Sequence, residues 1–222
     1  IATKWLKGTL SLDATVYQTN TYNQTIKAEI SPSTGYDGIY LQTGDVRNRG
    51  LEVGLGYDLK IKDKFNWNSY FTMSYNENKI MSLVEDYVNP VTGQREGRSY
   101  LEKGGIGGAR YILRTGGTLG DVYASNDFKR DADGNLLLDS NGRVSVQNYN
   151  NFNDYVKLGS VLPKYNLGWR NDFNIGNIGF GAMLAGRIGG VAISMTQAAL
   201  DHYGVSKESA EARDAGGVNI NG

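Results

Sequence analysis

The stretch LEVGLGYDLK, residues 51–60, decides the fold. Its odd-numbered residues are all apolar, and the residues between them are Glu52, Gly54, Gly56, Asp58 and Lys60. Because successive side chains of a strand point to opposite faces, this pattern predicts a β-strand with one apolar and one polar face. Ten residues also match the roughly 9–11 that a transmembrane β-strand needs.

Runs with the same alternation lie on both sides of this stretch. Before it, Leu10, Leu12, Ala14 and Val16 share one face of a run that ends near Tyr17. After it, a short polar break at 61–64 leads into a run whose apolar face is formed by Phe65, Trp67, Phe71, Met73 and Tyr75, opposite Asn66, Asn68, Thr72, Ser74 and Asn76. The break between the two longest runs predicts a hairpin with a tight turn.

A second hairpin is predicted near the end of the chain, around the two-residue turn Gly176-Asn177. Tyr165, Leu167, Trp169, Phe173 and Ile175 alternate with polar residues or glycine before the turn, and Ile178, Phe180, Ala182 and Leu184 alternate with small residues and Met183 after it. These alternating runs indicate an antiparallel sheet.

Long polar segments separate the hairpins, at Thr21–Asn48 and from Val84 to about Gly117. Short turns at one end and long loops at the other are typical of outer-membrane barrels. Further along, 133–135 and 140–142 carry turn residues that predict small hairpins, partly outside the membrane. Short loop helices are predicted at Met195–Tyr203 and Lys207–Arg213, the second capped by Ser206.

Composition agrees with an all-β chain. The 222 residues include 30 Gly and 15 Tyr but only 3 Pro, and no apolar run is long enough for a membrane helix. Lys and Arg together equal Asp and Glu, 23 against 23, so no basic excess points to nucleic acid. With no cysteine, a disulfide framework, a thiolate metal site and a cysteine nucleophile are excluded.

Three stretches invite chemical interpretations that the residues do not support. Asp131–Asn135 starts like a calcium loop, but the required Gly and Glu positions hold Leu136 and Gly142, so a turn is predicted. His202 has no marked nucleophile or orienting partner. Gly104–Gly108 lacks the Lys-Ser/Thr ending of a phosphate loop, and a flexible loop is expected. We therefore predict no enzyme, no catalytic, cofactor or metal site and no bound cofactor, and the substrate-binding residues stay unknown, with the Tyr- and Asn-rich loops as candidates.

The two faces predict where lipid and water would lie. The apolar faces suit lipid, whereas charged residues of the other face, Glu52, Asp58, Arg170 and Asp172, suit a hydrated lumen. Aromatic residues near strand ends, Trp5, Phe65, Trp67, Tyr75 and Tyr165, suit the membrane interfaces. A soluble sandwich would show the same alternation, so a surface binding protein or a small-barrel adhesin stays open as an alternative.

Three stretches resemble the SusC/RagA-like branch of TonB-dependent outer-membrane transporters. DVRNRGLEVGL, from Asp45, resembles that family's N-x-G-x-E strand start. FKRDADGN, from Phe128, resembles its D-x-D-G hairpin, and GSVLPKYNLGW, from Gly159, resembles its entry into the next strand. The region from Ala198 to Gly217 also resembles a late extracellular loop of the family.

The resemblance implies a large antiparallel barrel in the bacterial outer membrane, plugged by an N-terminal domain. This chain would give roughly eight strands of the barrel's C-terminal half. Residues 1–222 would be one part of the barrel domain, with the plug and the terminal strand outside the sequence. The implied function is TonB-dependent uptake of glycan or peptide fragments. The implied partners are membrane lipid, a SusD-like surface lipoprotein and the TonB complex acting through the plug.

Overall fold

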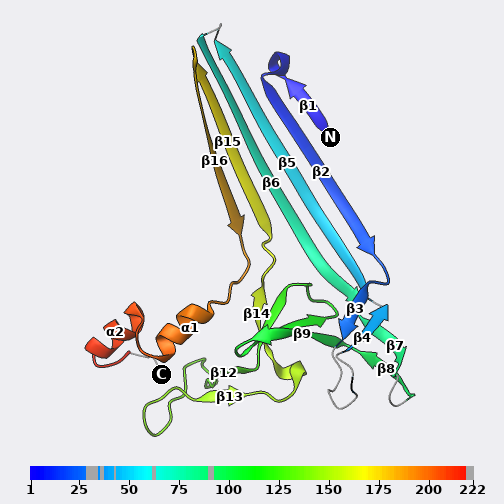
Figure 1. The fold of residues 1–222 in the computed structure, drawn as a ribbon, viewed down its shortest axis with the longest axis vertical. Helices are drawn as coiled ribbons and strands as arrows, with labels where there is room; N and C mark the ends of the chain where they lie inside the picture. Colours follow the sequence, from blue (N-terminus) through cyan, green and yellow to red (C-terminus); the bar gives the residue numbers. More distant parts are fainter. Residues whose placement is uncertain (29–34, 36–37, 43, 62–63, 90–92, 219–222) are drawn as a thin grey trace.

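The computed structural model describes residues 1–28, 35, 38–42, 44–61, 64–89 and 93–218 (Figure 1). Within these ranges the chain is built mainly from antiparallel strands, which confirms the predicted all-β class. None of the helices in this part of the chain has both the length and the apolar character to cross a membrane.

Six strands form one long sheet in the order β1-β2-β5-β6-β15-β16, and each pairs antiparallel with its neighbours. Their bounds are β1 (Ala2–Trp5), β2 (Leu10–Thr21), β5 (Asp45–Ile61), β6 (Phe65–Ser82), β15 (Tyr165–Ile175) and β16 (Ile178–Ile188). The expected number was roughly eight. The difference arises because residues between β6 and β15 fold into separate small sheets instead of adding long strands.

The tight turns of the long sheet lie at one end. Ile61 pairs with Phe65, Phe65 pairs with Ile175, and Ile175 pairs with Ile178, so the ends of four strands are level. The 3-10 turn η1 (Leu6–Gly8) joins β1 to β2 near the same end, where Leu10 pairs with Tyr57. Residues 62 and 63 of the predicted break lie outside the described residues. We call this the turn end.

The long connections lie at the opposite end, as predicted, and we call it the loop end (Figure 1). One connection holds the hairpin of β3 (Thr25–Ala28) and β4 (Ile39–Gln42). The other begins with β7 (Val84–Val88) and β8 (Arg95–Arg98) and later forms β12 (Asn126–Phe128) and β13 (Val146–Asn148). Bridges between Arg130 and Leu136 and between Leu138 and Val144 confirm the small hairpins expected there.

A compact four-stranded sheet also lies at the loop end, and we call it the loop-end sheet. It consists of β9 (Tyr100–Ile106), β10 (Ala109–Arg114), β11 (Asp121–Ala124) and β14 (Val156–Ser160), in the order β14-β11-β10-β9. The short helix η4 (Phe152–Asp154) precedes β14. The residues from Gly104 to Gly108 belong to β9 and its tight turn into β10, so the prediction of a flexible loop at these residues is wrong.

The main buried core joins the loop-end sheet to the long sheet. It contains Val46 of β5, Ile80 of β6, the following Leu83 and Val84, and Leu101 and Leu113 of the loop-end sheet. Backbone hydrogen bonds reinforce the junction: Ile80 N–H donates to Gly117 and the Gly116 N–H donates to Ile80, each at 2.8 Å. The loop-end sheet is therefore fixed to the extended ends of β5 and β6.

Two helices follow β16, close to the predicted positions. They are α1 (Met195–His202) and α2 (Lys207–Asp214), with Ser194 and Ser206 as their N-caps. The chain reaches them through Val191, whose N–H donates to Ser160 of β14 at 2.9 Å. This contact brings the chain back to the loop-end sheet.

Candidate functional site

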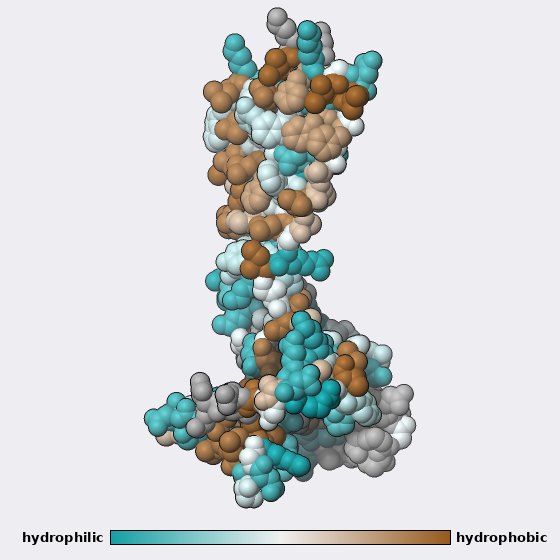
Figure 2. Space-filling view, turned by 90° about the vertical axis from the view of Figure 1, so that its left-hand side faces the viewer, coloured by the Kyte–Doolittle hydropathy of each residue, from teal (hydrophilic) through white to brown (hydrophobic). Residues whose placement is uncertain are grey.

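The long sheet has one continuous apolar face. Cross-strand registers align its apolar residues in rows, such as Leu12, Leu55, Phe71, Trp169 and Leu184. These large side chains are not covered by other parts of the described chain: Leu55 is 42% exposed, Trp169 45% and Leu184 65%. Figure 2 shows hydrophobic side chains gathered over the long strands, between more hydrophilic regions. An uncovered apolar band of this kind fits contact with lipid tails.

Aromatic rows mark both borders of this apolar band. Near the turn end, rings of Tyr57, Trp67, Phe173 and Phe180 follow one another across four strands at centroid separations of 5.5, 5.9 and 5.0 Å. Near the loop end, Tyr75 and Tyr165 lie 5.1 Å apart.

The spacing of these rows matches a bilayer. Phe65, at the turn end, and Tyr75 are ten residues apart on β6, which is roughly 33 Å along an extended strand. At a strand tilt of about 40° this spans about 25 Å along the membrane normal, the usual height of the apolar band of an outer-membrane barrel. Of the aromatic residues predicted for the interfaces, Phe65, Trp67, Tyr75 and Tyr165 lie at these borders, and Trp5 ends β1 beside the η1 turn.

Ser69 and Asn171 are polar residues on the apolar face, and both accept a hydrogen bond from a tryptophan. Ser69 and Asn171 lie directly opposite each other on β6 and β15. The Trp67 indole N–H donates to Asn171 Oδ1 at 3.1 Å, and the Trp169 indole N–H donates to Ser69 Oγ at 3.0 Å. The two indoles therefore satisfy these polar atoms and shield them from lipid. Periodicity did not predict this group, because the pairing depends on the register.

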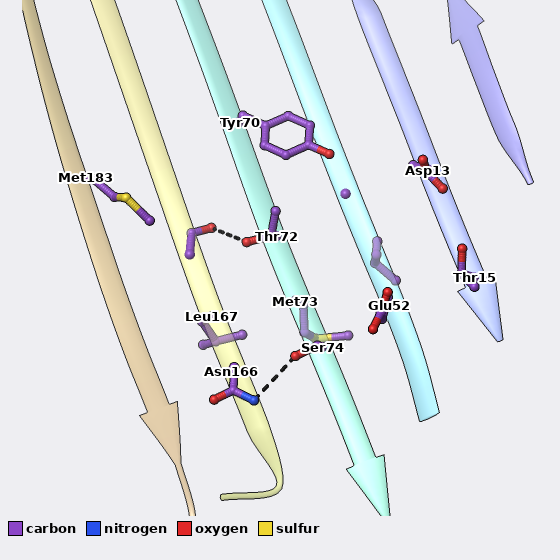
Figure 3. A pocket seen from close by; sticks show the side chains of 13 residues that line it. Asp13, Thr15, Glu52, Tyr70, Thr72, Met73, Ser74, Asn166, Leu167 and Met183 are labelled. Atoms are coloured by element: carbon purple, nitrogen blue, oxygen red, sulfur yellow. Dashed lines mark hydrogen bonds between the residues drawn. The ribbon is translucent and has the colours of Figure 1, made fainter. Parts of the chain in front are cut away.

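The opposite face of the sheet is polar and hollowed. A depression of about 410 Å³ lies on β2, β5, β6 and β15 (Figure 3). Its polar lining comes from Asp13, Thr15, Glu52, Tyr70, Thr72, Ser74 and Asn166. The two carboxylates and the amide are spread across three strands, which suits many weak hydrogen bonds to a polar ligand better than catalysis at one point.

Glycines on this face make room for neighbouring tyrosine side chains. A Cβ atom at Gly54 would meet the Tyr70 hydroxyl at 2.4 Å, and one at Gly56 would meet the Tyr70 ring at 3.2 Å. Tyr17 lies over Gly50 in the same way, with its ring 2.3 Å from a Cβ placed there. Tyr70 was not assigned a role from the sequence, although its even number placed it on the polar face.

Charged residues predicted for the polar face pair with their neighbours. The Arg170 guanidinium contacts both carboxylate oxygens of Asp172, with distances of 2.7 and 3.1 Å. The Asp58 carboxylate accepts a hydrogen bond from the Asn68 amide. Arg170 is exposed and Asp172 is half-exposed, so these groups fit a hydrated surface, as predicted.

A hydrogen-bonded chain connects the polar face to the loop end. The Tyr17 hydroxyl donates to Asn76 Oδ1 at 3.3 Å, and the amides of Asn76 and Asn78 both donate to Asn48 Oδ1. Asn78 Oδ1 in turn accepts the Leu119 N–H at 2.8 Å. Residues of β2, β5 and β6 are thereby tied to the turn that precedes β11.

That turn is held by an ion pair between a buried carboxylate and a half-exposed lysine. The Asp121 side chain is fully buried and lies 2.5 Å from Lys157 Nζ, while the Thr118 N–H and hydroxyl both donate to its carboxylate. The neighbouring Tyr123 ring packs under the Arg114 guanidinium at 4.4 Å. Burial raises the pKa of the Tyr123 phenol, and the nearby Asp121 carboxylate adds to the rise.

The remaining residues considered from the sequence lie apart from the polar face. Asp131 forms the predicted turn: its carboxylate accepts the N–H groups of Asp133 and Asn135, each at 2.9 Å. These hydrogen bonds, with the Asn135 side chain first, lower the pKa of Asp131. His202 ends α1 and packs edge-on against Tyr203. Within the described ranges no group of His, Asp and Glu is arranged to hold a metal ion.

Comparison with known proteins gives sequence relatives of one kind. No protein-family model matches the chain. It is 28% identical to TonB-dependent receptor P39 of Formosa agariphila over 117 residues, 25% identical to TonB-dependent receptor P3 over 180 residues and 26% identical to TonB-dependent receptor P26 over 196 residues, both from the same organism. The matches cover 53%, 74% and 82% of this chain but only 10%, 17% and 19% of those proteins. The chain therefore spans less than a fifth of each relative.

The fold is similar to that of solved importers. The RagAB peptide importer in its closed-closed state matches with a TM-score of 0.55 and 17% identity, over 85% of this chain and 20% of that one. A second structure of the RagAB peptide transporter also gives 0.55, with 18% identity over 83% and 20%. The predicted fold, the outer-membrane location and the resemblance to SusC/RagA-like TonB-dependent receptors are thus confirmed.

Proposed function

We propose that this chain forms one part of the wall of a large, plugged barrel that takes up glycan or peptide fragments in a TonB-dependent way. The observation that carries the proposal is the sheet with two different faces, apolar outside and polar inside. RagAB is a peptide importer, which supports the peptide class, and the hollow lined by hydroxyls, carboxylates and an amide suits either class.

The polar face favours a wide barrel over a small closed one. A barrel of about eight strands has an interior just wide enough for its own side chains to fill. Here the charged pair Arg170 and Asp172 would need water or partners inside a tight core. We infer that residues 1–222 belong to a single barrel domain whose other strands complete the wall.

The edges of the sheet support the same inference. Among the described residues, β16 pairs with β15 alone and β1 with β2 alone. All eleven residues of β16 are exposed, including Phe180 and Leu184. Unpaired backbone groups cannot face lipid, so these edges need further strands. Residues 1–222 produced alone with a signal peptide should aggregate or fail to insert, and a heat-modifiable, protease-resistant monomer in the outer membrane would contradict this.

We propose that the turn end faces the periplasm and the loop end faces outward, where a SusD-like lipoprotein would cover the mouth. Single cysteines at Asn177 in the tight turn and at Asn141 in the loop-end hairpin test the orientation in intact cells. A membrane-impermeant maleimide should label position 141 and leave position 177 unlabelled. Labelling with the opposite preference would reverse the assignment.

Transport is tested by changing the polar face without changing the fold. In the complete receptor, Asp13→Asn combined with Glu52→Gln removes both carboxylates of the hollow. We expect slower uptake of oligomeric substrate, with the protein still present at normal level in the outer membrane. Leu184→Ile, on the apolar face, is the control. Uptake that persists unchanged in cells without TonB would refute the proposed energy coupling.

A further inference from the structure

A polar belt lies on the outer face of the sheet, just beyond the apolar band. The last fully apolar row toward the loop end contains Val16, Leu51, Tyr75 and Tyr165. The next row on the same face is Gln18, Arg49 and Glu77, and the one after it is Asn20, Arg47 and Lys79. The change from apolar to polar therefore occurs within two residues, directly above the aromatic pair.

The belt lies at the height of lipid headgroups. Two residues of a strand tilted by about 40° rise about 5 Å along the membrane normal, and four rise about 10 Å. Headgroups extend beyond the hydrocarbon by about 5–8 Å on each side of a typical bilayer. Arg49 would then lie among the headgroups, and the backbone of Arg47 and Lys79 about 2–5 Å beyond them, within reach of these long cationic side chains.

Two cations of the belt lie directly opposite each other. Arg47 and Lys79 are directly paired across β5 and β6, an arrangement of like charges that destabilises a sheet. Within the described part of the chain neither has an ion-pair partner. Arg49 differs, because its Nε donates to Gln18 Oε1 at 2.7 Å and it lies opposite Glu77. An external anion between Arg47 and Lys79 would relieve their repulsion.

A hollow next to Arg47 offers groups that suit a sugar. It has a volume of about 290 Å³ and is lined by Gln18, Asn20, Tyr22, Asp45, Val46, Arg47 and Met81. The amides and the Asp45 carboxylate can hydrogen-bond to hydroxyl groups, and Tyr22, which is 64% exposed, offers a ring to stack on. Asp45 itself would repel a bare phosphate, so the hollow fits a ligand that carries both phosphate and sugar.

The two faces differ at this height. On the polar side, Val46 and Ile80 are covered by the loop-end sheet and are almost fully buried. On the outer side, Arg49 and Glu77 are exposed, and Arg47 and Lys79 are half-buried. A ligand on the outer side would therefore approach from the membrane and not from the lumen.

We propose that Arg47 and Lys79, with the adjoining hollow, bind the headgroup of a phosphorylated glycolipid in the outer leaflet. The phosphate lies between the two cations, and the sugar occupies the hollow beside Asn20 and Tyr22. This site is separate from the transport path and rests on the proposed orientation, with the loop end outside. Labelling of positions 141 and 177 tests that orientation independently, so the two failures are distinguishable.

The test uses the complete receptor, purified in mild detergent from its own outer membrane. Arg47→Gln, Lys79→Gln and the double variant remove the charge and keep a polar, unbranched side chain. Arg187→Gln, which removes an exposed cation of β16 from the polar face, is the matched control. Heat-modifiable gel mobility establishes that each variant is folded. Binding is then measured for a phosphorylated glycolipid, for the same lipid after phosphatase treatment, and for inorganic phosphate.

We expect each single variant to bind the phosphorylated glycolipid about five-fold more weakly, and the double variant about twenty-five-fold more weakly, while Arg187→Gln binds like the parent. Removing the lipid phosphates should weaken binding to the parent by a similar factor. Equal binding by the parent and the double variant would overturn the proposal, as would equal binding of both lipid forms. Inorganic phosphate that binds as tightly as the lipid would overturn the assignment to a membrane ligand.

Discussion

The long sheet and the loop-end sheet use apolar residues in opposite ways. In the loop-end sheet, Ile112 and Val122 have no exposed surface and pack as in a soluble domain. In the long sheet, Phe180 and Leu184 are 61% and 65% exposed. The strands of both regions are antiparallel, so the difference lies in the solvent that each face meets. A protein core stabilises the first region, and lipid takes that place for the second.

The largest expected effect comes from shortening a residue of the loop-end core. Ile112→Ala removes a fully buried side chain and leaves a cavity, which should lower the free energy of unfolding by about 2–5 kcal/mol. Leu55→Ala in the long sheet should cost about 1 kcal/mol or less in a bilayer, because lipid tails fill the space. Pulse proteolysis of the complete receptor in vesicles measures both. Equal costs would contradict the assignment of the apolar face to lipid.

The next effect is that of a charge on the lipid face. Leu55→Arg should destabilise the folded barrel by about 2–4 kcal/mol if Leu55 lies near the middle of the bilayer. Thr72→Arg places the same side chain at nearly the same depth on the polar face, since Thr72 pairs with Gly54, and should cost much less. Gly54 itself is a poor control, because its Cβ would meet the Tyr70 hydroxyl. Urea titration of folding into vesicles gives both values.

A Thr72→Arg variant that is as unstable as Leu55→Arg would mean that both faces are dry. The parent protein should also fold only with detergent or lipid. Stable monomeric folding in plain buffer would favour a soluble sandwich and contradict the outer-membrane assignment.

The long sheet was easier to predict from the sequence than the loop-end sheet, because its two faces meet different solvents. The long strands were predictable because lipid on one side and water on the other impose strict alternation, as in residues 51–60. The loop-end sheet was missed because its strands are short and Gly104–Gly108 resembled a loose connection. The sequences YIL at 111–113 and DVYA at 121–124 contain residues that favour β-strands. The second begins with Asp121, and a charged residue does not suggest a buried strand.

The candidate site was predictable only in part. Alternation assigned Glu52, Asp58, Arg170 and Asp172 to the polar face, and the structure places them there. Alternation did not bring Asp13 near Asn166, because that proximity needs the pairing of β6 with β15, whose ends Ser82 and Tyr165 are separated by 82 residues. The pairing of Trp67 with Asn171 was hidden for the same reason.

A smaller effect on stability is expected from the hydrogen bond between Trp67 and Asn171 on the lipid-facing side of the sheet. Asn171→Leu leaves the Trp67 indole N–H without its acceptor, and Trp67→Phe removes the donor. Hydrogen bonds between side chains in membranes are worth about 0.6 kcal/mol on average and at most about 1.7 kcal/mol. A double-mutant cycle on unfolding in vesicles should give a coupling of that size. A coupling indistinguishable from zero would show that lipid or water replaces this bond at no cost.

The smallest effect is expected in the hairpin beyond β12, outside both sheets. Asp131 accepts hydrogen bonds from the Asn135 side chain and from the N–H groups of Asn135 and Asp133, and it accepts them more strongly as a carboxylate than as the protonated acid. These hydrogen bonds hold its pKa below the ordinary value of about 3.9. Because the folded pKa is depressed, this contribution is fully present above the unfolded pKa and is lost as pH falls through the folded one. Amide exchange at residues 133 and 135, corrected for intrinsic rates, should therefore be slow at neutral pH and fast in acid.

Asp131→Ala should remove the protection from amide exchange at neutral pH. Asp133→Ala is the control and should retain the protection at Asn135, since within the described residues the Asp133 carboxylate accepts no hydrogen bond. Protection that survives in Asp131→Ala would show that the backbone bonds of the hairpin, such as Asp131 N–H to Asn135 at 3.0 Å, hold the turn without the carboxylate.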